Sequence, residues 1–88
     1  MITGTTESGF CFEIPEENLD DWSLLKLLRR LDEGQSQLIV DITERLLGAE
    51  QQEKLEAFLA ERNGGRVPAS AMVQEVMAIF AATKAGKN

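Results

Sequence analysis

Apolar and polar residues alternate near the start of the chain, and after residue 15 the spacing of apolar residues becomes helical. Phe10, Phe12 and Ile14 occupy every second position and would share one face of a strand, the pattern of a half-buried strand. Turn-forming residues at 7–9 separate this strand from an earlier, less regular one. Residues 1–15 are therefore predicted to form a β-hairpin arm. Because an isolated two-stranded hairpin is marginally stable in water, its aromatic face is expected to lie on the helices or on a partner.

Four helical segments are predicted in residues 16–82, at about 20–32, 36–47, 49–62 and 68–82. The first has leucines at 24, 27, 28 and 31, the i, i+3, i+4, i+7 spacing of a helix packed on a core, and Asp20 and Asp21 are placed to cap its start. The second segment is apolar over more than half its circumference and is expected to be central. Gly34, Gly48 and the sequence Asn63-Gly64-Gly65 punctuate the segments.

The last helix is expected to begin near Pro68 and to pack on the core through Val73, Val76, Met77 and Phe80. Residues 83–88 are predicted to form a flexible C-terminal tail. The predicted fold is mainly α: an N-terminal β-hairpin or short strand, followed by a compact bundle of about four short helices.

Composition limits the classes of partner. The 88 residues suffice for one hydrophobic core, and a hydrophobic fraction of 43 % is normal for a folded domain. Fifteen acidic and nine basic residues give a net charge of −6, which disfavours nucleic acid and anionic membranes as partners. We expect a cytoplasmic protein, since no apolar run is long enough to span a bilayer and the first residues do not resemble a signal peptide.

Catalytic and metal-binding residues are scarce. The chain has no histidine, and its single cysteine, Cys11, has no basic residue within several positions. The paired carboxylates are interpreted as solvated or helix-capping acids, and the turn at Gly64-Gly65-Arg66 lacks the spacing of a P-loop. The sequence therefore predicts no enzyme activity, no cofactor and no metal.

The predicted helices carry more apolar residues than their core-facing stripes account for. Trp22 and Leu25 lie on a different side of the first helix from its leucine stripe. Met72 and Ile79 widen the apolar face of the last helix. One interpretation is that the hairpin and a neighbouring helix cover these residues. The other is that they bind a protein partner, for which Trp and Met are favoured contact residues. These four residues are the candidate partner-binding site.

Several segments, in their order and spacing, resemble the small tail assembly chaperones of long-tailed bacteriophages, especially those of Gram-positive hosts. The resemblance covers FCFEIPEENLDD leading into WSLLKLLRRLDEG, then ITERLLGAEQQEKLEAFLAERNGGRVPASAMVQEVMAIFAA, and the final Lys87-Asn88.

The resemblance implies a protein that acts in the host cytoplasm during virion assembly and is not part of the mature virion. It would bind the long, hydrophobic tape measure protein and keep it soluble while the tail tube forms. The family also implies a longer product, made by ribosomal frameshifting near the end of the reading frame. The alternative is a small acidic adaptor or regulatory protein that self-associates as a weak homo-oligomer, for example through an edge strand of the hairpin.

Overall fold

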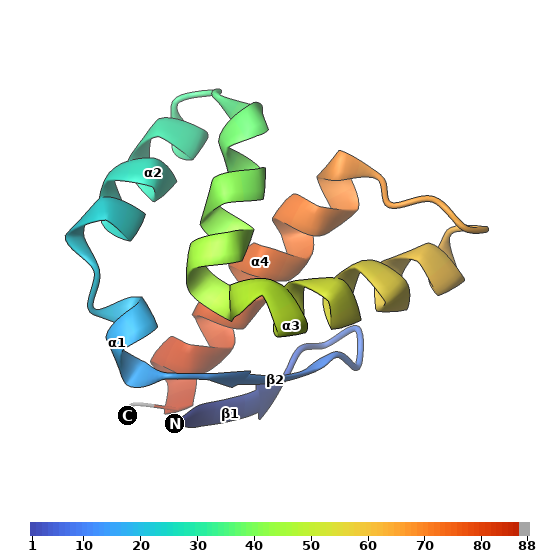
Figure 1. Ribbon diagram of the computed structural model, residues 1–88, viewed down its shortest axis with the longest axis horizontal. Coiled ribbons are helices and arrows are strands. Elements are labelled where there is room, and N and C mark those ends of the chain that lie inside the picture. The colour runs from blue at the N-terminus through green and yellow to red at the C-terminus, as the bar shows by residue number, and fades with distance from the viewer. Residues whose placement is uncertain (87–88) are drawn as a thin grey trace.

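The alternating residues at the start of the chain form the predicted hairpin. In the computed structural model, which describes residues 1–86, strand β1 (Ile2–Thr5) pairs antiparallel with β2 (Cys11–Ile14), and Gly4 lies opposite Phe12 (Figure 1). Phe10, Phe12 and Ile14 are all buried, as predicted. The hairpin therefore forms one wall of the core.

A buried threonine closes the hairpin and ties it to the last helix. The backbone N–H of Thr6 donates to the Phe10 carbonyl oxygen at 2.9 Å, and the Phe10 N–H donates to the Thr6 hydroxyl oxygen at 3.2 Å. The same hydroxyl donates to Glu75 Oε1 at 2.5 Å across 69 residues of sequence. The position of the hairpin turn is thus fixed by the body of the protein.

The helices follow the hairpin in the predicted order, with different boundaries. They are α1 (Glu16–Leu19), α2 (Trp22–Asp32), the 3-10 turn η1 (Ser36–Leu38), α3 (Ile39–Arg62) and α4 (Ala69–Gly86). The short α1 was not predicted, and α2 begins two residues later than expected because Asp21 is its N-cap. The predicted fold class, a hairpin followed by about four short helices, is confirmed.

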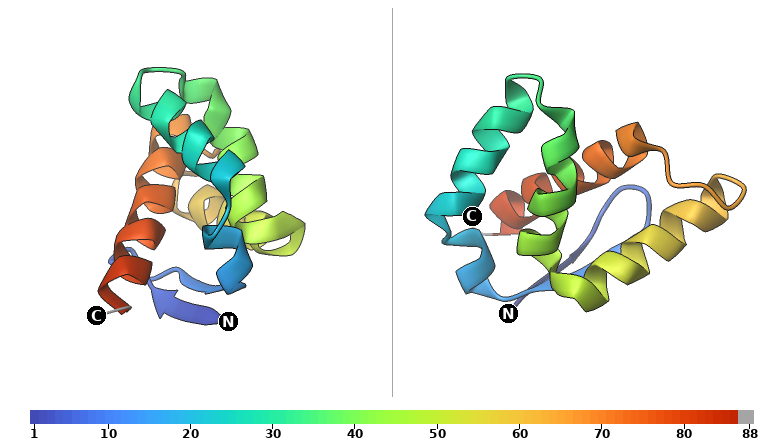
Figure 2. Two further views of the ribbon diagram at one scale, coloured as in Figure 1. Left: turned by 90° about the vertical axis from the view of Figure 1, so that its left-hand side faces the viewer. Right: turned by 45° about the horizontal axis from the view of Figure 1, so that its top comes forward.

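The second and third predicted helices are the two halves of α3, and the predicted break between them at Gly48 is confirmed as a sharp bend. Gly48 has φ 80° and ψ 165°, a conformation that is accessible in practice only to glycine. Near the bend, the Leu46 carbonyl oxygen accepts a hydrogen bond from Asn18 Nδ2 of α1 at 2.9 Å. The bend carries residues 49–62 across the hairpin, whereas residues 39–47 stand beside α2 (Figures 1 and 2).

One hydrophobic core joins all these elements. The hairpin contributes its aromatic face, α2 contributes Leu24, and both halves of α3 and one face of α4 supply the rest. Its buried members are Phe10, Phe12, Ile14, Leu24, Ile39, Ile42, Leu46, Leu47, Leu55, Leu59, Met72, Val76 and Ile79. The prediction of a central second helix is confirmed for residues 39–47, since Ile39, Ile42, Leu46 and Leu47 are all buried, whereas residues 36–38 form the 3-10 turn η1.

The predicted C-terminal tail is wrong for residues 83–86, because α4 continues through Gly86. Alanines at 81, 82 and 85 favour helix, and the Thr83 side chain is buried, with its hydroxyl donating to the Phe80 carbonyl oxygen at 2.7 Å. Residues 87–88 lie outside the described residues.

Candidate partner-binding groove

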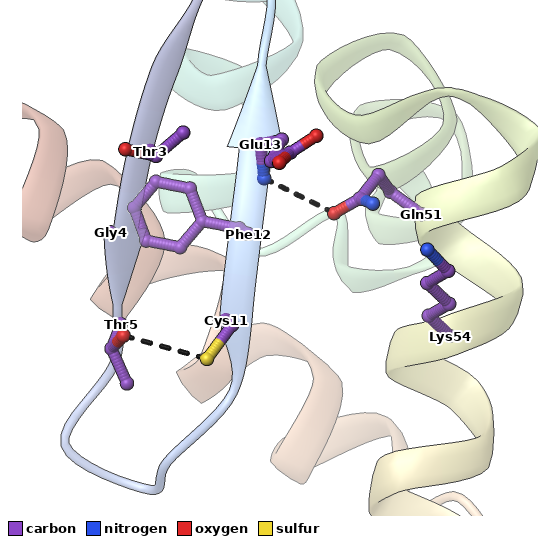
Figure 3. Close-up of a pocket in the computed structure, with 8 residues that line it drawn as sticks. All are labelled: Thr3, Gly4, Thr5, Cys11, Phe12, Glu13, Gln51 and Lys54. Carbon is purple, nitrogen blue, oxygen red and sulfur yellow. Dashed lines mark hydrogen bonds between the residues drawn. The ribbon is translucent and has the colours of Figure 1, made fainter.

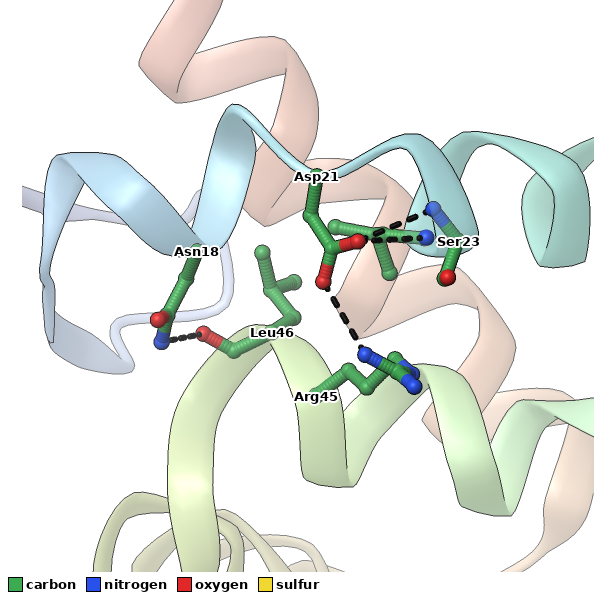
Figure 4. Close-up of polar contacts among 6 residues, drawn as sticks. Asn18, Asp21, Ser23, Arg45 and Leu46 are labelled. Atoms are coloured by element: carbon green, nitrogen blue, oxygen red, sulfur yellow. Dashed lines mark hydrogen bonds and ion pairs between the residues drawn. The ribbon is translucent and has the colours of Figure 1, made fainter.

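The start of α2 is firmly placed. The Asp21 carboxylate accepts hydrogen bonds from the backbone N–H groups of Ser23 at 2.9 Å and Leu24 at 3.4 Å (Figure 4). Its other oxygen accepts a hydrogen bond from Arg45 Nη1 of α3 at 3.1 Å. The cap satisfies free amides of the helix, and the Arg45 contact ties α2 to α3. Leu24 consequently points into the core.

Trp22 and Leu25 lie on the outside of α2, as the helical spacing predicted. The Trp22 side chain is 76 % exposed and Leu25 is 52 % exposed, whereas Leu24 is completely buried. The hairpin covers neither of them. Both residues are therefore available to a partner.

Met72 and Ile79 were wrongly predicted to contact a partner. Met72 is 8 % exposed and Ile79 is fully buried, and both belong to the core. The face of α4 that packs inward carries Met72, Val76 and Ile79, so the predicted inward stripe is rotated about the helix axis. Apolar residues occupy most of the circumference of α4, and periodicity alone could not indicate which face the hairpin would cover.

The same rotation places three residues of the predicted core stripe at the surface. Met77 is 49 % exposed, and Val73 and Phe80 are half-buried. They lie opposite Leu25 and further α2 residues across a groove of about 730 Å³. The groove is lined by Leu25, Leu28, Arg29, Leu31, Asp32, Val73, Met77, Phe80 and Ala81. In the side view of Figure 2, α2 stands in front, with α4 on one side and α3 on the other.

A second hollow, of about 460 Å³, lies over the outer face of the hairpin and is mainly polar. Its lining includes Gly4, Cys11, Phe12, Gln51 and Lys54, and Figure 3 shows the Phe12 ring lying across Gly4. A Cβ atom on Gly4 would lie 2.7 Å from Phe12 Cζ, so the ring requires glycine there. The Glu13 N–H donates to Gln51 Oε1 at 3.2 Å, which joins β2 to α3.

Reactive groups are sparse in the described part of the chain. Cys11 is exposed, and its sulfur lies 3.6 Å from the Thr5 hydroxyl oxygen. Within residues 1–86, no three side chains of His, Cys, Asp or Glu come together in a way that could hold a metal ion. The described helices include none with the length and hydrophobicity needed to cross a bilayer.

Comparison of the chain with protein families, with curated proteins and with solved structures gives no match.

Proposed function

We propose that this protein is a tail assembly chaperone of a long-tailed bacteriophage, which binds an amphipathic helical segment of the tape measure protein in the groove between α2 and α4. The observation that carries the proposal is the groove itself, whose walls present the exposed apolar side chains of Leu25 and Met77. The sequence resemblance to phage tail chaperones supplies the identity of the partner.

The groove suits a helix better than an extended peptide. Residues of α2 and α4 form its two walls. The half-buried lining residues are Leu28 and Leu31 of α2 and Val73 and Phe80 of α4. An amphipathic helix presents apolar residues at i, i+3, i+4 and i+7, a stripe that fills such a groove. Met77 has a flexible, polarizable side chain that can adapt to anchors of different shape, as a chaperone of a long and varied partner requires.

The charge of the chain suits a solubilising role. The net charge is −6, and the exposed residues of α1 and α3 include Glu16, Glu17, Glu44, Glu53 and Glu56. A complex that covers the apolar face of its partner and adds negative charge resists association with further copies.

Co-expression tests the proposal. A fragment of the tape measure protein from the same genome is expressed with and without this chain, and its soluble fraction is measured. We expect the wild-type chain to raise the soluble fraction, and both Leu25→Glu and Met77→Glu to abolish the increase, because each puts a charge on a groove wall. The matched control is Val40→Glu, since Val40 is 60 % exposed and is not among the residues that line the groove.

If Val40→Glu reduces solubility as strongly as the groove variants do, the groove is not the binding site. If the wild-type chain leaves the fragment insoluble, the chaperone proposal fails.

A self-associating adaptor is the second candidate, and the hairpin favours it. The described sheet has two strands, so β1 has no third strand beside it within residues 1–86, and an open strand edge is a template for pairing. A stable dimer by light scattering that does not bind tape measure fragments would support the adaptor and oppose the chaperone.

A further inference from the structure

On the side of α2 away from the groove, residues of α2 and α3 line two adjoining hollows. One hollow, of about 210 Å³, is lined by Ser23, Lys26, Leu27, Arg30 and Arg45, and the other, of about 470 Å³, by Leu27, Asp41, Glu44 and Arg45. Because Leu27 and Arg45 belong to both, the two hollows form one continuous surface. The side view of Figure 2 shows α4 and α3 on opposite sides of α2, so this surface and the groove face different ways.

The charges on this surface are separated by helix. The α2 helix contributes a basic row, Lys26 and Arg30, which are exposed and one turn apart. The first half of α3 contributes an acidic row, Asp41 and Glu44, which are also exposed. No residue of either row forms an ion pair with another side chain that the structure describes. The half-buried Leu27 lines both hollows, so the two rows lie at similar heights along their helices.

This separation does not stabilise a single copy of the chain. Like charges three or four residues apart on a helix repel each other, and each row is such a pair. The helix dipoles favour Asp41 in the first turn of α3 and Arg30 in the last turn of α2. Lys26 and Glu44 lie further inside their helices and have no such role. The pattern therefore points to a facing surface in which the two signs are exchanged.

A second copy of the chain presents that surface. In Figure 1, α2 and the first half of α3 run side by side in opposite directions, and η1 lies in the short connection between them. A twofold axis parallel to these helices, through the middle of the surface, places α2 of each copy over α3 of the other. Each basic row then faces the acidic row of the other copy, and the two Leu27 side chains lie near the axis.

We infer that the protein forms a weak twofold dimer through this surface, in which the basic row of each copy contacts the acidic row of the other. The dimer goes beyond the proposed function and does not depend on it, and its surface differs from the hairpin edge. Exposed ion pairs contribute little each and are screened by salt, so the dimer forms at high protein concentration and dissociates at high ionic strength. The groove stays open in this dimer.

Two complementary variants test the inference. The first, Lys26→Glu/Arg30→Glu, has acids in both rows, and the second, Asp41→Lys/Glu44→Lys, has bases in both rows. Neither variant can pair with itself through this surface. In a mixture, the acidic α2 of the first variant faces the basic α3 of the second, and the basic α2 of the second faces the acidic α3 of the first. A heterodimer therefore regains both contacts.

Association is measured by sedimentation equilibrium on the chain alone, whose monomer mass is 9.7 kDa. The matched control is Lys54→Glu/Arg66→Glu, which changes the net charge as much as the first variant does, at exposed positions outside both hollows. Circular dichroism checks that each variant is folded. The single substitutions Lys26→Glu and Glu44→Lys replace any double variant that is not.

We expect the wild-type chain to reach twice the monomer mass at high concentration, and its dimer affinity to fall at least about tenfold when NaCl rises from about 0.05 M to about 0.5 M. Each complementary variant alone should associate at least about tenfold more weakly than the wild-type chain, and their equimolar mixture should regain the wild-type affinity. The control variant should dimerise more strongly than the first variant does.

A wild-type chain that stays monomeric up to about 1 mM would overturn the inference, as would association that salt does not weaken. A mixture that associates no better than its components, or a control as weak as the first variant, would also overturn it, because net charge rather than this surface would then govern association. The proposed function has a separate test, the solubility of the tape measure fragment, and none of these outcomes refutes it.

Discussion

Replacing Thr6 with valine removes one hydroxyl and leaves the shape of the side chain almost unchanged. The hydroxyl accepts the Phe10 N–H at 3.2 Å and donates to Glu75 Oε1 at 2.5 Å. Thr6, Phe10 and Glu75 are each no more than 6 % exposed, so water cannot easily replace the lost partner. Thr6→Val therefore leaves a buried N–H and a buried carboxylate unsatisfied.

The expected loss is large for a domain of this size. An unsatisfied buried polar group costs about 1–3 kcal/mol, and a charged group costs more, so the substitution should lower the free energy of unfolding by about 2–5 kcal/mol. A domain of 88 residues has a total stability of about 4–13 kcal/mol. The measurement is urea unfolding followed by helical circular dichroism, with an unchanged denaturant slope as the sign that the folded state persists.

The double variant Thr6→Val/Glu75→Met is the control, because methionine has a volume close to that of glutamate and needs no hydrogen-bond donor. It should be more stable than Thr6→Val alone, since it no longer buries an unsatisfied carboxylate, and the Phe10 N–H lacks its partner equally in both variants. A loss below about 0.5 kcal/mol for Thr6→Val, or strictly additive effects of the two substitutions, would refute the view that this hydrogen bond holds the hairpin on α4.

Three further predictions concern stability and use the same unfolding assay. Ile42→Ala should cost about 2–5 kcal/mol because Ile42 is fully buried, whereas Leu25→Ala should cost under about 1 kcal/mol, and equal losses would mean that Leu25 serves the core. Gly4→Ala should cost about 1–3 kcal/mol through the clash with Phe12, and Phe12→Leu should make the alanine less costly, a rescue whose absence would contradict the clash. Gly48→Ala should cost at least about 1 kcal/mol from backbone strain alone, because open space surrounds the added carbon, and a neutral result would mean that the bend relaxes.

Elements specified by local chemistry were predicted well. The alternation of Phe10, Phe12 and Ile14 identified the buried face of β2, and the leucine spacing located α2. The break at Gly64 and Gly65 was also correct, and both residues have positive φ values, 66° and 92°. In each case a few neighbouring residues decide the conformation, so the sequence contains the needed information.

Features that depend on long-range contacts were not predictable in the same way. The sequence predicts the break at Gly48, which the structure confirms, but not the hydrogen bond from Asn18 to Leu46 beside it, because that bond joins residues 28 apart. Thr83, at the start of the predicted tail, is buried in the folded protein, and a polar residue near the end of the chain gives no sign of this in the sequence.

The candidate site shows the same division. The spacing predicts that Trp22 and Leu25 lie off the apolar stripe of α2 but leaves open whether other elements cover them, and in the structure both are exposed. The prediction that Met72 and Ile79 contact a partner is wrong. Apolar residues lie on most sides of α4, and packing against the hairpin determines which face is buried. Glu75 lies on the buried face of α4 and was the available signal for that face. Its partner Thr6, however, could be identified only from the folded structure.

The central claim, that the groove between α2 and α4 holds the partner, is tested most directly by NMR. A tape measure fragment is titrated into the isotope-labelled chain, and the amide and methyl shifts are followed. We predict the largest changes at Leu25, Leu28, Val73 and Met77, with little change at Val40. Changes concentrated on β1 and the rest of the hairpin, with the groove residues unaffected, would contradict the account.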